Sequence, residues 1–237
     1  MPLPQTPARN AVCIIAAMKQ LALGLALDAA MGLEASVVGG NAELLSALWS
    51  VCLDDPGERL VYLWGVPGSG RSHLLNAAAR TAAEAGRPVV RFDGDSRHDP
   101  CALVLADDVD GLDGPEQIAL FNLINAQRSD GGALIAAGPV PPGELALRPD
   151  LRTRLAWGLV YQVQPLDDED KVLALSRHAQ ARGFRMPEEV ANYLLRHGQR
   201  DLRSLILALD RLDRRSIEQH RPLTIPLLRE VLDAADS

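Results

Sequence analysis

The sequence predicts an α/β protein in which a parallel sheet with helices on both faces is followed by a small all-α subdomain. Between residues 36 and 164, apolar strand-like segments alternate with segments of helical period, and after Pro165 only helical patterns continue. Buried strands joined by helical crossovers are typical of parallel sheets covered on both faces. A glycine-rich segment after the first strand of the sheet, residues 65 to 72, predicts that this core binds a nucleotide.

These patterns divide the chain into a leader at residues 1 to 35, a core at 36 to 164 and a helical lid at 165 to 237. Asp167 and Thr224 are the expected N-caps of the first and last lid helices. Strands are expected at 59–64, 88–92, 102–106, 133–137 and 159–164, and helices at 42–52, 72–84, 115–127, 168–181, 187–196, 201–219 and 225–234.

Composition limits the class of protein. A hydrophobic content of 47% can supply a buried core, and the net charge of -7 gives no general attraction to a phosphate backbone. Three separated cysteines fit reduced, buried thiols in a cytoplasmic protein. The longest apolar stretch near the start, residues 11 to 18, is shorter than the roughly 20 residues that span a bilayer, so no membrane association is expected.

The segment from Gly65 to Ser72 fits the phosphate-binding spacing G-x-x-x-x-G-K-[ST] except at the lysine, where Arg71 stands. Because a strand precedes it and a helix follows, backbone N–H groups and the helix N-terminus would point at phosphates. The alternative is a glycine-rich turn without a ligand. ADP or ATP is the expected ligand, with Mg²⁺ on the Ser72 hydroxyl. The expected nucleotide contacts are Gly65, Pro67, Gly68, Ser69, Gly70, Arg71, Ser72 and His73.

Two carboxylates follow the strand expected at residues 102 to 106. We expect Asp107 to hold the Mg²⁺ shell and Asp108 to orient the attacking water, although an acidic turn after a strand is common. The next strand ends at Ala137, Gly138 and Pro139, without a hydrogen-bonding side chain. The guanidinium of arginine is a wide planar group, whereas the lysine ammonium is a compact point charge, so the two would hold a transferring phosphoryl group differently. We therefore expect nucleotide binding with little intrinsic ATPase activity.

Two arginines outside the cradle are further candidates. Arg154 precedes the last core strand and could act in trans on a neighbour's nucleotide, or be an ordinary surface arginine. Arg203 opens a lid helix and could reach the nucleotide of its own subunit, or pair with Asp201 or Asp210. The residues alone leave both choices open.

With these residues in view, the chain resembles the AAA+ part of the DnaA family of bacterial replication initiators, and most closely its Hda branch of regulatory inactivators. The similarity spans residues 38 to 231 and is carried by the strings at 70–75, 154–158, 164–171 and 223–226. It implies a AAA+ core with a lid and an arginine finger at Arg154. Because the sequence ends at Ser237, we expect the initiator's C-terminal DNA-binding domain to be missing.

The leader contains a peptide similar to the motif by which these inactivators bind the DNA polymerase III sliding clamp. The matching residues are Gln20, Leu21, Leu23 and Leu25. The resemblance implies a glutamine in a polar notch and leucines in an apolar pocket, which would place the protein on DNA indirectly through the clamp. The alternative is the start of an amphipathic helix. Because Met18 directly precedes this segment, residues 1 to 17 are hypothesised to lie upstream of the native start.

Three functions remain. The preferred one is an inactivator that promotes hydrolysis of ATP bound to DnaA. The others are a helicase loader or motor that uses its own ATP hydrolysis, and a scaffold with a vestigial pocket. The sequence leaves open which nucleotide is preferred and whether the chain forms a homodimer.

Overall fold

The computed structural model of the chain describes residues 32–55, 57–95, 99–199 and 201–234. The chain divides into two compact units, the first built mainly from Glu43–Gly65 and Arg71–Val163 and the second from Ala35–Ala42, Val66–Gly70 and Gln164–Ser237. Gln20, Leu21, Leu23 and Leu25, like Cys13, lie outside the described residues.

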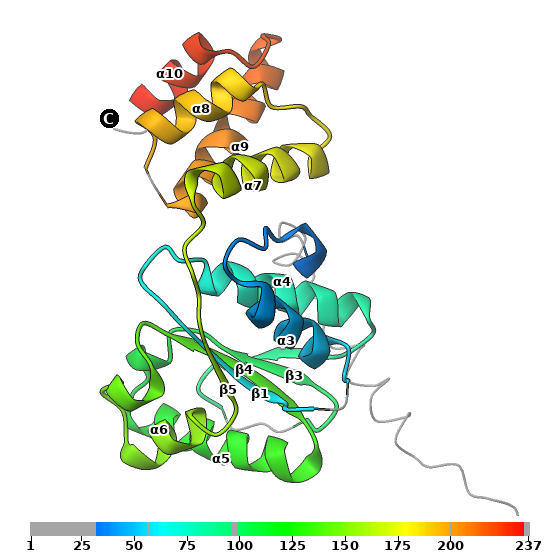
Figure 1. The fold of residues 1–237 in the computed structure, drawn as a ribbon, viewed down its shortest axis with the longest axis vertical. Coiled ribbons are helices and arrows are strands. Elements are labelled where there is room, and N and C mark those ends of the chain that lie inside the picture. Colours follow the sequence, from blue (N-terminus) through cyan, green and yellow to red (C-terminus); the bar gives the residue numbers. More distant parts are fainter. Residues whose placement is uncertain (1–31, 56, 96–98, 200, 235–237) are drawn as a thin grey trace, which may run out of the picture. The chain divides into compact units, whose positions relative to one another are not determined.

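The first unit is organised around a parallel sheet of five strands in the order β2-β3-β4-β1-β5 (Figure 1). Strand β1 is hydrogen-bonded to β4 on one side and β5 on the other, although β2 and β3 follow it in sequence. The strands are β1 at Leu60–Trp64, β2 at Val89–Arg91, β3 at Leu103–Ala106, β4 at Ala133–Gly138 and β5 at Leu159–Gln162. The predicted doubly covered parallel sheet is thus confirmed.

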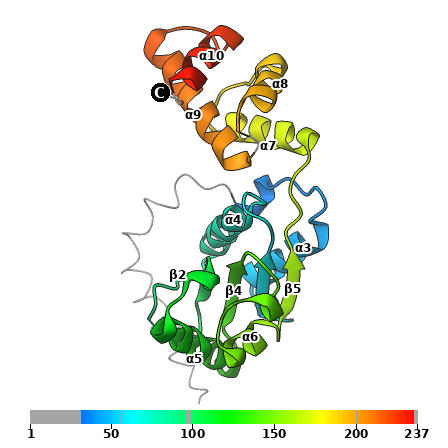
Figure 2. The ribbon, with the colours of Figure 1, turned by 90° about the vertical axis from the view of Figure 1, so that its left-hand side faces the viewer.

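Alternating residues of β1, β3 and β4 belong to two separate apolar clusters. Val61 and Leu63 of β1 pack with α3 (Ala42–Cys52) and α4 (Arg71–Glu84), whereas Leu60 and Tyr62 pack with α5 (Gly114–Asp130) and α6 (Pro149–Leu155). The two helix layers lie on opposite faces of the sheet (Figure 1 and Figure 2). Side chains that alternate along a strand explain this division.

Local signals fix the ends of α5. Asp113 and Glu116 form a capping box, in which each side chain accepts a hydrogen bond from the other residue's backbone N–H, and Gly131 ends the helix with a φ of 75°. Helix α6 was not predicted from the sequence. It has only 7 residues, too few for a helical period to stand out, and it buries only Leu151 and Leu155.

The described residues of the second unit form four helices around an apolar core of their own. They are α7 at Asp168–Ala181, α8 at Glu188–His197, α9 at Leu202–Gln219 and α10 at Ile225–Asp233. The Asp167 side chain accepts a hydrogen bond from the backbone N–H of Asp170, which confirms this N-cap. Thr224 occupies the N-cap position of α10, as expected, but its side chain makes no capping hydrogen bond. Pro226, the second residue of α10, has no N–H to offer.

A short N-terminal segment is bonded into the second unit. The Asn41 side chain donates to the Gln164 carbonyl over 3.0 Å and accepts from the Gln164 N–H over 2.8 Å. Arg177 of α7 donates to the carbonyl of Ser36. Asn41 is therefore hydrogen-bonded to Gln164, which follows β5 in the chain.

Two cysteines fall within the described residues and differ in environment. Cys52 is fully buried, and burial raises the pKa of its thiol to about 12. Cys101 is only partly buried, so the expectation of complete burial was wrong for this residue, which lies in the loop that leads to β3. No helix of the described residues combines the length and apolar character that crossing a bilayer requires.

We expect Gly158→Ala to destabilise the first unit, because a methyl group at this position would lie 1.9 Å from the backbone oxygen of Leu60. Overpacking of this kind costs about 1–3 kcal/mol. Gly143→Ala is the control, since no heavy atom lies within 4 Å of the added carbon. Urea unfolding followed by tryptophan fluorescence isolates this unit, because all 3 tryptophans belong to it. Equal midpoints for both variants would contradict the expectation.

Candidate functional site

The sheet brings the predicted cradle and carboxylates to one edge. Trp64, the last residue of β1, is in register with Gly138 of β4, and Ala106 of β3 is in register with Ala136 of the same strand. Because all strands are parallel, the segments that follow β1, β3 and β4 leave from the same edge, where open α/β sheets bind ligands.

The cradle backbone adopts the conformation that its glycines permit. Gly68 and Gly70 have φ values of 80° and 105°, and the N–H of Ser69 donates to the carbonyl of Val66 over 3.0 Å to close the turn. Side chains rarely adopt such φ values, which accounts for glycine at both positions. Helix α4 starts at once, at Arg71, so its first N–H groups lie next to the turn.

Two buried polar groups of the cradle lack a partner within the part of the chain that the structure describes. They are the Ser69 hydroxyl and the Nη1 of Arg71, whose side chain is only 13% exposed. A buried polar group without a partner costs about 1–3 kcal/mol, so both groups favour a ligand with several acceptor oxygens. The residues present therefore fit a phosphate group, and Ser72 and His73 are exposed beside it.

The two carboxylates after β3 differ in their contacts. Asp107 accepts a hydrogen bond from the backbone N–H of Asp108 over 3.0 Å, and Asp108 itself adopts the left-handed region with a φ of 45°. The Asp108 carboxylate lies 3.7 Å from Nη2 of Arg71. Partial burial and the negative charge of Asp107 raise the pKa of Asp108, and Arg71 opposes this shift. The structure thus brings together Arg71, Asp107 and Asp108.

A residue that the sequence analysis did not single out, Tyr62, fills the space at the end of β4. Its hydroxyl donates to the carbonyl of Val140 over 2.9 Å, and a methyl group on Gly138 would lie 2.2 Å from the hydroxyl oxygen. Burial raises the pKa of Tyr62 further above its ordinary value. The hydroxyl is therefore a neutral donor already used by the protein's own backbone. Its only sequence signal is a polar atom in the otherwise apolar strand β1.

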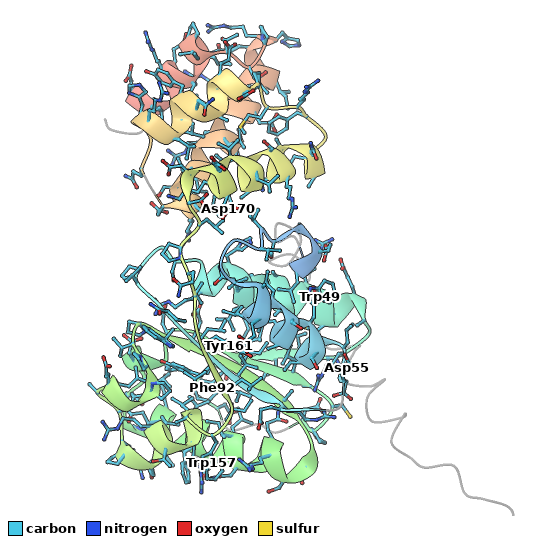
Figure 3. All side chains as sticks on the ribbon, in the orientation of Figure 1. Trp49, Asp55, Phe92, Trp157, Tyr161 and Asp170 are labelled. Atoms are coloured by element: carbon cyan, nitrogen blue, oxygen red, sulfur yellow. The ribbon has the colours of Figure 1, made fainter. Side chains whose placement is uncertain are left out.

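Arg154 lies at the end of α6 and packs on aromatic rings of its own subunit. Its guanidinium carbon is 3.4 Å from the centroid of the Trp157 ring and 5.2 Å from that of Phe121. Figure 3 labels Trp157 beside α5 and α6. Arg152, the other arginine of this helix turn, donates to the carbonyl of Gly143. The two arginines therefore differ, since only Arg154 has its guanidinium against aromatic rings.

Arg203 is an exposed residue in the first turn of α9. Asp201 uses its carboxylate to cap α9 through the N–H of Ser204, while Asp210 contacts His178 and Arg182. Among the described residues, no ion pair joins Arg203 to either carboxylate. An electrostatic interaction with Asp201 remains, since the backbone hydrogen bond of Ser204 and the charge of Arg203 both lower the pKa of the Asp201 carboxyl.

The described side chains form no preformed metal site. No cluster of three or more His, Cys, Asp or Glu side chains within the described ranges could hold a metal ion. A Mg²⁺ ion at the cradle would therefore depend on oxygens of the nucleotide, with Ser72 and Asp107 as the protein's contribution, which is how Mg²⁺ is commonly held beside phosphates.

Comparison with known proteins identifies the lid and the fold. The family model described as "Hda, lid domain" matches residues 168–232. Domain III of the Thermotoga maritima replication initiation protein DnaA is similar over 86% of this chain and 95% of that chain, with 21% identity and a TM-score of 0.74. AMPPCP-bound DnaA from Aquifex aeolicus is similar over 79% of this chain and 65% of that chain, with 21% identity and a TM-score of 0.63.

A more distant neighbour is RuvB from Thermotoga maritima, a Holliday junction branch migration motor. It is 14% identical, with a TM-score of 0.59 and coverage of 82% of this chain and 69% of that chain. These likenesses confirm the predicted fold of a parallel sheet with flanking helices, followed by a helical subdomain.

We expect Arg71→Ala to weaken binding of Mg·ADP by about ten- to a hundredfold, because a charged hydrogen bond to phosphate contributes about 1.5–3 kcal/mol. Isothermal titration calorimetry measures the affinity. Arg80→Ala is the matched control, since Arg80 lies on the same helix but pairs with Glu84 at the surface. Equal affinity of the Arg71 variant and the parent would refute this role for Arg71.

Proposed function

We propose that this chain, an Hda/DnaA-like AAA+ protein, is a regulatory inactivator of DnaA. It supplies Arg154 to the ATP bound by DnaA and so promotes its hydrolysis, while the leader holds the protein on the DNA-loaded sliding clamp. The Hda-type lid at residues 168–232 and the DnaA-like fold support a DnaA-related replication regulator. The observation that carries the finer proposal is the contrast between two arginines, Arg71 in the cradle and Arg154 on α6.

The chain's own site is suited to binding rather than hydrolysis. Arg71 would hold the phosphates of ADP or ATP with Nη1, Ser69 would donate its hydroxyl, and Asp107 and Ser72 would complete the shell of a bound Mg²⁺. Asp108 would have to orient water, but its carboxylate faces the guanidinium of Arg71 at 3.7 Å. That contact engages a carboxylate oxygen that would otherwise accept a hydrogen bond from the attacking water. Arg203 is the proposed lid contribution to nucleotide binding.

The end of β4 supports the same conclusion. Phosphoryl transfer depends almost entirely on positioning and electrostatics, so a polar group between the water and the terminal phosphate matters. In this chain, residues 136 to 138 offer only alanine and glycine, and the nearby Tyr62 hydroxyl is engaged with the Val140 carbonyl. We therefore expect the bound nucleotide to act as a structural ligand that is turned over slowly.

Arg154 is the residue that would act on a partner. It lies between Leu151, which anchors α6 in the core, and the edge strand β5, which pairs with β1 alone. A guanidinium supplied in trans stabilises the charge that develops on the transferred phosphoryl group. The partner's site supplies the cradle, the metal ion and the water, and this chain supplies one cation.

The clamp contact is proposed from the sequence of the leader. Gln20, Leu21, Leu23 and Leu25 have the order of an extended anchor peptide, in which a few buried side chains give most of the affinity. With a net charge of -7, the chain needs such a tether to be concentrated at DNA. A homodimer that covers Arg154 would be an inactive storage form.

Arg154→Ala is expected to abolish the stimulation of ATP hydrolysis by DnaA, measured with DNA-loaded clamp as single-turnover release of phosphate. Removal of an arginine finger costs about 10³–10⁵ in rate, so the variant should fall to the rate of DnaA alone. Arg152→Ala is the control, because Arg152 donates to Gly143 within its own subunit. Stimulation by the Arg154 variant equal to that of the parent would exclude the finger. Rapid ATP turnover by this chain alone, lost in Asp108→Asn, would instead favour a loader or motor.

We expect Gln20→Ala to abolish retention of the full chain on immobilised sliding clamp, because the glutamine side chain would lose its polar notch. Asp28→Ala, outside the proposed motif, should bind as the parent does. Binding of the full chain to the immobilised sliding clamp is measured by surface plasmon resonance. Retention of the Gln20 variant would refute the tether without touching the role of Arg154.

A further inference from the structure

The Arg154 side chain packs against two aromatic rings. Its guanidinium carbon lies 3.4 Å from the Trp157 centroid, the distance of a close parallel stack, and 5.2 Å from the Phe121 centroid. A cation over an aromatic face is attracted by the ring's negative quadrupole, more strongly where water is excluded. Arg154 therefore has two favourable contacts that do not involve any partner.

The same arrangement leaves one donor unused. Nε of Arg154 is buried and finds no hydrogen-bond partner among the described residues. An arginine that engages phosphate usually does so through paired N–H groups of its planar fork. As long as Nε is covered, this fork cannot be presented in full, so the stacked side chain is not arranged for phosphate contact.

A second cation acts on the same ring. Arg128, in the last turn of α5, has its guanidinium carbon 4.5 Å from the Trp157 centroid. Two like charges over one indole repel each other, and this repulsion opposes the attraction of each to the ring. Trp157 itself is 38% exposed, which leaves the stack accessible from solvent.

We propose that Trp157 and Phe121 hold Arg154 in a retracted resting state, and that the guanidinium must leave the stack to reach the nucleoside triphosphate of a partner. Trp157, Phe121 and Arg128 are positioning residues in this scheme, since they act through Arg154. The proposal rests on the proposed function and adds a regulatory step to it. The attraction of two rings favours the retracted state, whereas the unpaired Nε and the charge of Arg128 favour release.

The fraction of molecules with an extended Arg154 determines how much of this chain is needed to stimulate the partner. A partner that accepts only the extended arginine binds with an affinity reduced by the extended fraction. If about one molecule in ten is extended, the concentration of this chain that gives half-maximal stimulation is raised about tenfold. The maximal rate is unaffected, because the guanidinium in the complex has already left the ring.

The resting state can be observed in the chain alone. In protein labelled with ¹³C,¹⁵N-arginine, the indole should shift the δ protons of Arg154 upfield, and those of Arg128 by less because it lies farther from the ring. The more strongly shifted signal should be absent in Arg154→Lys. Trp157→Leu should return the resonance to an ordinary position. Trp49→Leu is the matched control, because Trp49 packs in the cluster on the other face of the sheet. An unshifted Arg154 resonance in the parent overturns the proposal.

Activity then tests the consequence. Trp157→Leu is expected to lower the half-maximal concentration for stimulated ATP hydrolysis about three- to tenfold at an unchanged maximal rate. Phe121→Leu should act in the same direction with a smaller effect, and Arg128→Gln in the opposite direction, because the remaining cation then holds the ring more tightly. Circular dichroism melting checks that each variant is folded.

The outcomes separate the two proposals. A lower maximal rate in folded Trp157→Leu, without a gain in affinity, would mean that the ring aligns Arg154 in the active complex, and it overturns the retracted state. A shifted Arg154 resonance in a chain whose Arg154→Ala variant stimulates normally would leave the stack in place and refute the proposed function.

Discussion

The position of β1 between β4 and β5 is the constraint on which the rest of the first unit depends. Because every strand pair is parallel, the segments after β1, β3 and β4 leave the sheet at one edge. Gly65, where the cradle starts, the two aspartates and Gly138 all lie at that edge for this reason. Tyr62 is in register with Ala136, and its hydroxyl reaches the position of Gly138, where a larger side chain would collide with it.

The proposed phosphate chemistry depends on two arginines whose hydrogen bonding is incomplete. Arg71 in the cradle and Arg154 on α6 each keep a buried nitrogen without a partner among the described residues. Such groups cost about 1–3 kcal/mol each, which a phosphate oxygen can recover. Arg71 is fixed beside Asp108, whereas Arg154 rests on neutral rings. The first is arranged to retain a ligand, and the second must give up its ring contacts to reach one.

The helical unit depends on a different set of forces. Its apolar core is separate from the two clusters of the sheet, and Asp167 and Asp201 start two of its helices with side-chain caps. The bonds between Asn41 and Gln164 tie an N-terminal segment to this unit. Caps are read easily from sequence because the bonded residues are three positions apart. The contact between Asn41 and Gln164, which lie 123 residues apart, leaves no such pattern in the sequence.

The sequence by itself determined the parallel sheet, the lid helices and the phosphate cradle, because hydrophobic period, caps and glycine spacing act over a few residues. Only the tertiary structure decided that Tyr62 fills the end of β4, that Asp108 faces Arg71, and that Arg154 stacks on Trp157 and Phe121. Helix α6 was also missed, because 7 residues are too few for a helical periodicity to be recognised. These features arise where separate elements meet, and a side chain's partners there depend on packing that no local pattern records.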